Sequence, residues 1–356
     1  MSEKLNVAVV FGGKSGEHEV SLMSATNVIK AMNKERYNIY MIGITKQGRW
    51  MAYKGDVNKI ADGSWEKEAA GLGREETISV LFSSLFKGEA KSKMDVVFPV
   101  LHGPNGEDGT VQGLFEILDI PYVGCGVMAS ALGMDKEFSK QLFKDAGLAV
   151  GEYMVVLKAD IEKDVSSTVS LAEDKFTYPV FIKPVNMGSS VGITKAHNRE
   201  ELIRGLRDAC KYDRKVMIEE NINCREFECA VLGNNNPIAS GIGEIIPSNE
   251  FYDYEAKYFD DGKSVLVIPA ELTASKTEEM REAAVKAYKS LDCCGMSRVD
   301  FFVEKETEKV YINEINTIPG FTKISMYPKL WDAAGVSYSK LIDRLIDLAI
   351  ERHNEY

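Results

Sequence analysis

The sequence LNVAVVFGG, residues 5–13, determines the expected fold of the N-terminal part of the chain. An apolar, valine-rich run ends at two glycines, and apolar side chains then recur at helical spacing over residues 20–32. A strand, a glycine turn and a helix in this order are typical of a parallel α/β unit. The pattern continues with apparent strands at 39–45 and 94–101 and a helix at 110–118. An open parallel α/β domain is therefore predicted over residues 1–126.

The rest of the chain predicts two further domains. In the first, residues 127–222, Asp135 is a fair N-cap for a helix that Gly147 ends. Its other predicted elements are strands at 178–184, 191–195 and 215–221 and a helix at 199–210. The second, residues 223–356, has predicted strands at 226–232, 237–246, 296–303 and 310–315, and helices at 276–291 and 338–353. Residues 55–76 are polar and mixed, which predicts a surface excursion. A length of 356 residues agrees with two or three domains.

Composition excludes several classes of protein. The net charge of −11 repels nucleic-acid backbones and anionic lipid, so neither is expected as a partner. No run approaches the length of apolar sequence that crosses a membrane. The six cysteines include no C-x-x-C pair, which predicts buried, reduced thiols and a cytoplasmic protein.

Two polar loops are expected at the carboxyl edge of the first sheet, where α/β proteins bind ligands. The glycine loop after residue 11 lacks the G-x-G-x-x-G spacing, and the second strand lacks an acid for a ribose, so a dinucleotide site is weakly supported. The glycines permit a tight turn, or Glu17 holds a substrate ammonium. The second loop, 101–109, places His102 near the same edge, although its acids would also suit a plain helix N-terminus.

A lysine at the end of an apolar strand, Lys183, precedes a loop of small residues, 184–192. Glycines let the backbone approach phosphates and the lysine supplies a point charge, so this loop suits a flap over a nucleotide. A plain hairpin would look similar. The chain has no Walker motif, so any nucleotide is held in another way.

The most specific chemical signal comes from two neighbouring strands near the C-terminus. Alternation places Glu314 and Asn316 on one face of their strand, and an adjacent strand brings Asp300 beside them. Oxygen ligands without His or Cys select a hard cation such as Mg²⁺, the usual companion of nucleotide phosphates. Acids on a solvated sheet face are the alternative. No nucleophile motif stands out, so phosphoryl transfer by positioned charges and metal is favoured.

Together these motifs resemble the D-alanine-D-alanine ligase family of the ATP-grasp superfamily over nearly the whole chain. The resemblance is carried, in this order, by GGKSGEHEVS (12–21), LHGPNGEDG (101–109), GMDKEFSK (133–140), FIKPVNMGSSVG (181–192), FYDYEAKY (251–258), MSRVDFF (296–302) and NEINTIPGFTKISMYP (313–328). It implies an N-terminal open α/β domain followed by a two-part ATP-grasp fold. It also implies ATP-dependent joining of two D-alanines through a D-alanyl phosphate, for peptidoglycan precursor synthesis.

The resemblance further implies a set of site residues. ATP would contact Lys136, Lys183, Ser189, Ser190, Glu219, Glu226 and Lys257. Two Mg²⁺ ions, with Mn²⁺ as an alternative, would be held by Asp300, Glu314 and Asn316. The first D-alanine would meet Glu17 and His102, with Arg298 and the Gly320 N–H on the developing oxyanion, and the second would lie near Lys257, Ser325 and Met326. Tyr258 would hydrogen-bond with Ser189 and Glu17.

Several alternatives remain at this point. D-Alanine–D-serine ligation is the nearest one, because a small pocket discriminates a hydroxyl only weakly. A binding regulator that has lost turnover and an NAD-dependent oxidoreductase rank lower, since the metal ligands are intact and the dinucleotide motif is missing. Residues 250–263, rich in tyrosine and acids, suit a mobile lid or an exposed loop. The family also leads us to expect a homodimer.

Overall fold

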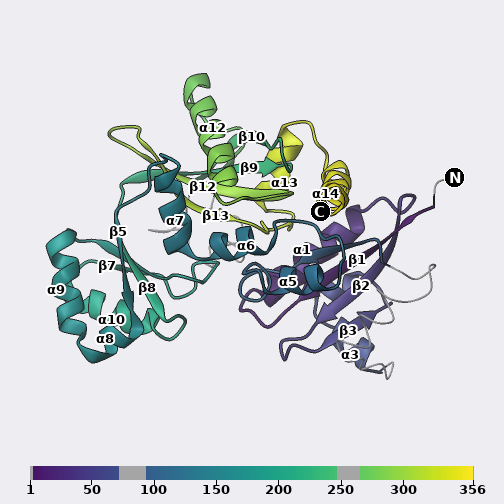
Figure 1. Ribbon diagram of the computed structural model, residues 1–356, viewed down its shortest axis with the longest axis horizontal. Coiled ribbons are helices and arrows are strands. Elements are labelled where there is room, and N and C mark those ends of the chain that lie inside the picture. Colours follow the sequence, from purple (N-terminus) through teal and green to yellow (C-terminus); the bar gives the residue numbers. More distant parts are fainter. Residues whose placement is uncertain (1–2, 72–93, 247–264, 356) are drawn as a thin grey trace.

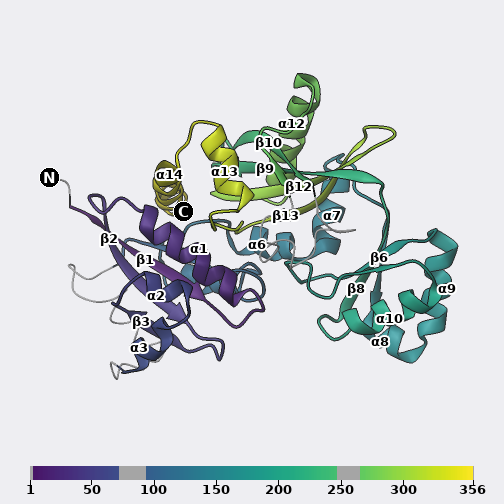
Figure 2. The ribbon, with the colours of Figure 1, turned by 180° about the vertical axis from the view of Figure 1, so that it is seen from behind.

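A computed structural model describes residues 3–71, 94–246 and 265–355 and contains three separate sheets (Figures 1 and 2). The N-terminal sheet has the strand order β3-β2-β1-β4. Its strands are β1 (Leu5–Gly12), β2 (Tyr37–Ile44), β3 (Trp50–Tyr53) and β4 (Val96–Val100), and its helices are α1 (His18–Ala31), α2 (Asn58–Ala61), α3 (Trp65–Gly71) and α5 (Thr110–Ile117). β1 is parallel to β2 and β4, and β3 adds an antiparallel edge. The predicted α/β fold class is therefore confirmed, with one edge strand reversed.

The predicted surface excursion at residues 55–76 is largely exposed or half-buried in its described part, but it also contains a buried anchor. Trp65 is fully buried, and its ring lies 5.1 Å from that of Phe11 in an edge-on arrangement. A Cβ added to Gly43 would come within 2.2 Å of the Trp65 ring, so the glycine makes room for it. The polar residues around Trp65 concealed an apolar anchor. Residues 72–76 lie outside the described residues.

The central sheet has the order β5-β8-β6-β7 and its neighbouring strands are antiparallel. Its elements are β5 (Tyr153–Leu157), β6 (Val180–Pro184), β7 (Thr194–Ala196), β8 (Lys215–Glu220), α8 (Lys158–Lys163), α9 (Val165–Lys175) and α10 (Arg199–Ala209). Ile182 and Ile218 join the core beneath these helices. Because side chains alternate along a strand, the next residues, Lys183 and Glu219, lie on the opposite face. We call residues 151–222 the central lobe.

The C-terminal sheet has the order β11-β10-β9-β12-β13. Its elements are β9 (Cys224–Leu232), β10 (Ile238–Ile246), β11 (Val265–Val267), β12 (Met296–Glu304), β13 (Val310–Asn316), α12 (Ala274–Ser290), α13 (Met326–Ala333) and α14 (Tyr338–Asn354). Helices α6 (Val127–Met134) and α7 (Lys136–Asp145) pack against β13. These two helices, assigned to the central domain by sequence, thus lie on the C-terminal sheet, while the predicted domain boundaries remain a prediction. Asp135 caps α7 as expected, accepting hydrogen bonds from two backbone N–H groups.

Two expectations from composition can be compared with the structure. All six cysteines are unbridged. Within the described ranges, no helix has the length and apolar character needed to cross a bilayer.

Candidate active site

A cavity of about 570 Å³ separates the central lobe from the C-terminal sheet. Its wall from the lobe includes Lys183 and the loop of residues 187–190, and its wall from the C-terminal sheet includes Glu314. The connecting segment 219–226 closes one side, so that Glu219 and Glu226 both line the space. The sequence-predicted nucleotide residues Lys136, Lys183, Ser189, Ser190, Glu219 and Glu226 therefore border one cavity.

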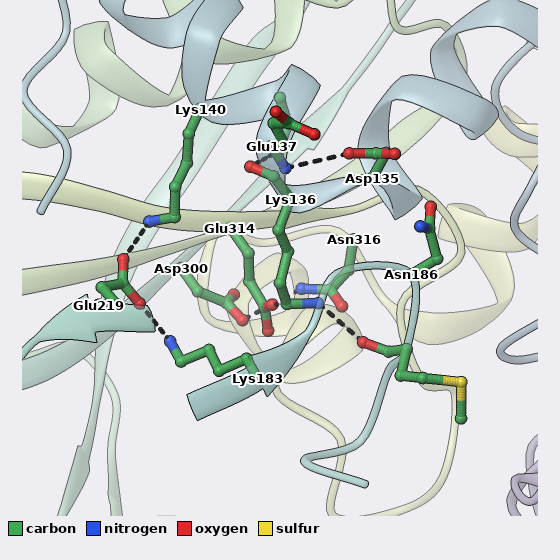
Figure 3. A network of polar contacts seen from close by, with 12 residues as sticks. Asp135, Lys136, Glu137, Lys140, Lys183, Asn186, Glu219, Asp300, Glu314 and Asn316 are labelled. Atoms are coloured by element: carbon green, nitrogen blue, oxygen red, sulfur yellow. Dashed lines mark hydrogen bonds and ion pairs between the residues drawn. The ribbon is translucent and has the colours of Figure 1, made fainter. Parts of the chain in front are cut away.

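A buried carboxylate lies between two lysines in this wall (Figure 3). Glu219 Oε2 accepts from Lys183 Nζ at 2.6 Å, and Glu219 Oε1 lies 2.6 Å from Lys140 Nζ. Burial raises the pKa of the Glu219 carboxyl, but the two lysines outweigh burial and lower it to about 2. Glu219 is therefore ionised at neutral pH and forms ion pairs with both lysines.

Lys136 reaches the same region from the first turn of α7. Its Nζ donates to the Met187 carbonyl at 2.7 Å and lies 3.3 Å from Glu314 Oε2. The helix thereby links the loop of the central lobe to β13, with one charged side chain between them. A lysine in this position is able to contact phosphates at the mouth of the cavity.

Arg298 and Asp300 lie two residues apart on β12 and share one face of it. The guanidinium donates to both carboxylate oxygens of Asp300, at 2.7 Å each, and lies 3.0 Å from Glu228 on β9. Asn316 also donates to Asp300, at 3.1 Å. Two carboxylates thus hold Arg298 in a fixed orientation, which is the arrangement that a preorganised donor requires.

The predicted metal ligands are neighbours in space. Asp300 and Glu314 are register partners on β12 and β13, and Asn316 contacts Asp300. Over the described part of the chain, no group of three or more His, Cys, Asp and Glu suits a metal ion. Two carboxylates and one amide nevertheless form an oxygen donor set, which fits Mg²⁺ with water completing the coordination.

Glu17, predicted to meet a substrate ammonium, lies at the N-terminus of α1 and is buried. It accepts a hydrogen bond from Ser189 of the central lobe. Cβ atoms built onto Gly103 and Gly188 would lie 2.4 Å and 3.0 Å from its carboxylate. Glycine is therefore required at Gly103, which also has a φ of +72°, for the two loops to close around this carboxylate.

His102 is buried and does not line the large cavity. Its ring nitrogens are 3.2 Å from the Ile318 carbonyl and 3.2 Å from Ser24 Oγ. Burial lowers the pKa of His102 to about 4, so the ring is neutral at physiological pH. Nearby, Glu107 accepts from the N–H groups of Gly103 and Ile318, at 2.7 and 3.2 Å. Burial and the Glu17 charge raise the pKa of Glu107.

The loop 317–325 contains the remaining described site residues. A Cβ at Gly320 would lie 2.8 Å from Ser325 Oγ, and that oxygen accepts from the Thr322 N–H at 2.9 Å. Ser325 is the N-cap position of α13. The Met326 side chain is buried against β10, since a Cβ at Gly243 would come within 2.7 Å of its sulfur. Only the backbone of Met326 is thus suited to a ligand. Lys257, Tyr258 and the proposed lid 250–263 lie outside the described residues.

Comparisons with known proteins show the family of the chain. The descriptions "D-ala D-ala ligase N-terminus" and "D-ala D-ala ligase C-terminus" match residues 6–125 and 142–347. The chain belongs to the D-alanine–D-alanine ligase family. It is 58% identical to the D-alanine–D-alanine ligase of Thermoanaerobacter sp. (strain X514), over 99% of this chain and 98% of that protein. The identity to the corresponding ligase of Acetivibrio thermocellus is 54%, over 100% and 98%.

Solved structures of the family superimpose on the whole chain. The D-alanine–D-alanine ligase of Coxiella burnetii has a TM-score of 0.84 and 36% identity, covering 99% of this chain and 97% of that one. The VanG D-Ala:D-Ser ligase of Enterococcus faecalis has a TM-score of 0.85 and 39% identity, covering 98% and 100%. The predicted ATP-grasp fold, the ligase class and the ATP dependence implied by the family are thereby confirmed. The identities of 58% and 54% to the ligases of Thermoanaerobacter and Acetivibrio exceed the 39% identity to the D-Ala:D-Ser ligase, so the D-serine alternative is not favoured.

Sequence reasoning missed two charged residues of this site. Lys140 contacts Glu219 and Glu228 contacts Arg298, and both of these partners were predicted. Lys140 follows Lys136 by four positions on one helix, a spacing that places both on one face and was available in the sequence. Glu228 lies opposite Asp300 only through the pairing of β9 with β12, which no local pattern reveals.

Proposed function

We propose that this family member joins two D-alanines at the cavity, using ATP bound between the central lobe and the C-terminal sheet. The observation that carries the proposal is that Lys136 and Lys183 line the same cavity as Glu314, whose register partner on β12 is Asp300. Cations and oxygen ligands gathered at one cavity suit a metal-bound triphosphate. Glu226 and Glu219 would approach the adenine and ribose, and the loop of Ser189 and Ser190 would cover the phosphates.

Asp300, Glu314 and Asn316 would hold Mg²⁺, as two ions. When bound, the metal neutralises charge on the phosphate oxygens. Lys136 forms an ion pair with Glu314 in this structure. If Glu314 binds the metal, the Lys136 ammonium would turn toward the phosphates instead. The lysines act as point charges and do not need to exchange protons.

The first D-alanine would place its ammonium on Glu17. The carboxylate oxygen of this D-alanine attacks the γ-phosphorus of ATP and forms an O–P bond. The bond from the γ-phosphorus to ADP breaks, which leaves a D-alanyl phosphate. The amine of the second D-alanine then attacks the acyl carbon, loses a proton, and displaces phosphate. Arg298 and the Gly320 N–H would stabilise the oxyanion of the tetrahedral intermediate, and their fixed positions lower the reorganisation needed at that step.

The second D-alanine would lie with its carboxylate near Ser325 and the N-terminus of α13, together with Lys257. His102, being neutral and hydrogen-bonded, would support the substrate loop, and Tyr258 would complete the hydrogen bonds of Ser189 and Glu17. A cytoplasmic location and a homodimer complete the proposal. Sedimentation of the purified chain tests the dimer directly.

The function is tested by supplying the purified protein with ATP, Mg²⁺ and D-alanine. Phosphate release matched by D-alanyl-D-alanine is expected, and the absence of both would exclude the proposed function. Competition between D-alanine and D-serine tests the second subsite, where we expect the dipeptide of D-alanine to dominate. An excess of the D-serine product would contradict this assignment.

The role of Arg298 is tested by Arg298→Ala. Loss of one oxyanion donor lowers turnover by about 10²–10³, whereas the affinity for ATP should change much less because the partner charge develops during the reaction. Turnover and calorimetric ATP binding are measured on the same preparation. Equal losses in both would refute the oxyanion role.

A further inference from the structure

The ion-pair cluster of Lys140, Glu219 and Lys183 contains one member that does not line the cavity. Lys183 and Glu219 both border the space proposed for ATP, whereas Lys140 lies behind them on α7 with 1% of its surface exposed. Within the part of the chain that the structure describes, Glu219 is the carboxylate within ion-pair distance of Lys140. The buried ammonium therefore acts on the cavity through Glu219.

The charge of this cluster depends on Lys140. Two ammonium groups and one carboxylate give 2 − 1 = +1, whereas Lys183 and Glu219 alone give 1 − 1 = 0. A neutral pair offers little attraction to a triphosphate, because Glu219 already satisfies Lys183 in a buried site. With Lys140 present, Lys183 is able to turn to a phosphate while Glu219 keeps a cationic partner.

We propose that Lys140 is a positioning residue for ATP, which holds Glu219 and keeps the cluster cationic so that Lys183 is available to the phosphates. This inference rests on the proposed binding of ATP in the cavity. Lys140 itself touches neither nucleotide nor substrate. Figure 3 shows its side chain meeting Glu219 from the side opposite Lys183.

The surroundings of Glu219 favour this account. Burial opposes the charged form of Glu219, and both lysines oppose the effect of burial. Among the described residues, the other titratable groups that act on the cluster are Tyr153 from β5, Glu226 from β9 and Glu314 from β13, and none of them is a cation. Lys136 lines the same cavity but is paired with Glu314. Without Lys140, the buried Glu219 carboxylate would have Lys183 as its ion-pair partner, and the pKa of Glu219 would rise.

The test is the dissociation constant for ATP, measured by calorimetry with Mg²⁺ at several pH values from about 6 to about 8.5. Lys140→Met keeps a long unbranched side chain but removes its positive charge. We expect the dissociation constant to rise on the order of tenfold over wild type at the alkaline end, as for loss of one nearby charge. The ratio should be smaller at the acid end than at the alkaline end, because the pKa of Glu219 rises without Lys140 and its protonation restores the charge of +1.

Two comparisons make the result specific. Lys144→Met changes a lysine one turn later on the same helix, which is 37% exposed, and should leave the ratio near one at every pH. Lys140→Gln removes the same charge but retains hydrogen-bond donors for Glu219, so it serves if the methionine variant does not fold. The ionisation of ATP does not affect the ratio, because the dissociation constant of each variant is divided by that of wild type at the same pH.

A ratio that is raised equally at all pH values would reduce Lys140 to a packing role and overturn the proposal. A ratio near one throughout, or one that grows toward low pH, would overturn it as well. Failure of the wild-type protein to bind ATP at all is a different outcome, since it would contradict the proposed function rather than the role of Lys140.

Discussion

The N-terminal and C-terminal sheets share one apolar core, whereas the central lobe has a core of its own. Phe98 of β4 packs with Phe321, and α14 lies against β4, so side chains from both ends of the chain form one cluster. The core of the lobe contains only residues from within it, between 161 and 218. The lobe meets the other sheets at the cavity through polar contacts, among them Lys136–Met187 and Ser189–Glu17.

This difference explains where the reaction is expected to occur. Burial of apolar side chains away from water stabilises the contact between the N-terminal and C-terminal sheets. We call these two sheets and their helices the base of the molecule. Polar contacts between two lobes are readily exchanged for contacts with a charged ligand, because the hydrogen-bonding groups keep partners in both states. The boundary of the lobe is therefore suited to a nucleotide that enters and leaves.

The largest predicted effect on stability comes from the shared core. Phe321→Ala should destabilise the protein by about 3–5 kcal/mol, because Phe321 is fully buried and its ring is 6.1 Å from that of Phe98. Urea unfolding measures the change. Phe138→Ala is the matched control, because that ring is 53% exposed and should cost far less. Similar losses for the two would contradict the shared core.

A comparable substitution in the lobe should have a local effect. Leu206→Ala removes a fully buried side chain on α10 and should cost about 2–5 kcal/mol. Hydrogen exchange is expected to rise in the strands of the lobe and to stay unchanged in β1 and β4. Leu171→Ala, at a leucine that is 57% exposed on α9, is the control. Faster exchange throughout the molecule would show that the lobe is not an independent core.

Acid should remove the stabilising contribution of His102 at a higher pH than that of Glu219. The pKa of His102 is about 4 in the folded protein, below its ordinary value near 6.5. The unfolded chain therefore binds a proton first, and the contribution of His102 to stability falls by up to about 3 kcal/mol as the pH drops from 6.5 to 4. The raised pKa of Glu107 acts in the opposite direction, because there the folded protein binds the proton first. Glu219, with a pKa of about 2, loses its contribution only as the pH falls below about 4.5.

Urea unfolding of wild type and of His102→Gln at pH 7 and at pH 5 isolates the contribution of His102. Between these two values the free energy of unfolding should fall further in wild type than in the variant, because glutamine does not titrate. An unchanged pH dependence in this variant would show that the ring is not held neutral.

The smallest effect on stability is expected for a surface ion pair between the N-terminal domain and α14. Arg36 lies 3.3 Å from Asp343 and 3.0 Å from Asp347 of α14, and its side chain is 41% exposed. Arg36→Ala should cost less than about 1 kcal/mol, and still less in about 0.5 M salt, because solvent and ions screen the pair. A larger, salt-resistant loss would mean that polar contacts, not the apolar core, hold the base together.

Much of the fold and site could be predicted from the sequence because the signals are local. The strand before Gly12, the strand that ends at Lys183 and the pair of strands with Asp300 and Glu314 were all found by periodicity and position. The expectation that they form one ligase site came from family motifs. Trp65, by contrast, is buried through contacts with Phe11 and the space over Gly43, which lie on other elements.

The missed contacts share a physical reason. Lys140 meets Glu219 across 79 positions of sequence, and the environment of a buried ion pair is fixed by tertiary packing. Residues 127–145 likewise pack on the C-terminal sheet although they precede the lobe in the chain. Local pattern does not specify which of two neighbouring cores a helix will join.

The central claim is that ATP lies between the central lobe and the C-terminal sheet. A crystal structure with a non-hydrolysable ATP analogue, Mg²⁺ and D-alanine tests it most directly. We predict the phosphates between Lys183 and the Asp300–Glu314 pair, with Lys140 still on Glu219 and the D-alanine ammonium on Glu17. An analogue bound elsewhere, with Lys183 still paired only with Glu219, would contradict the account.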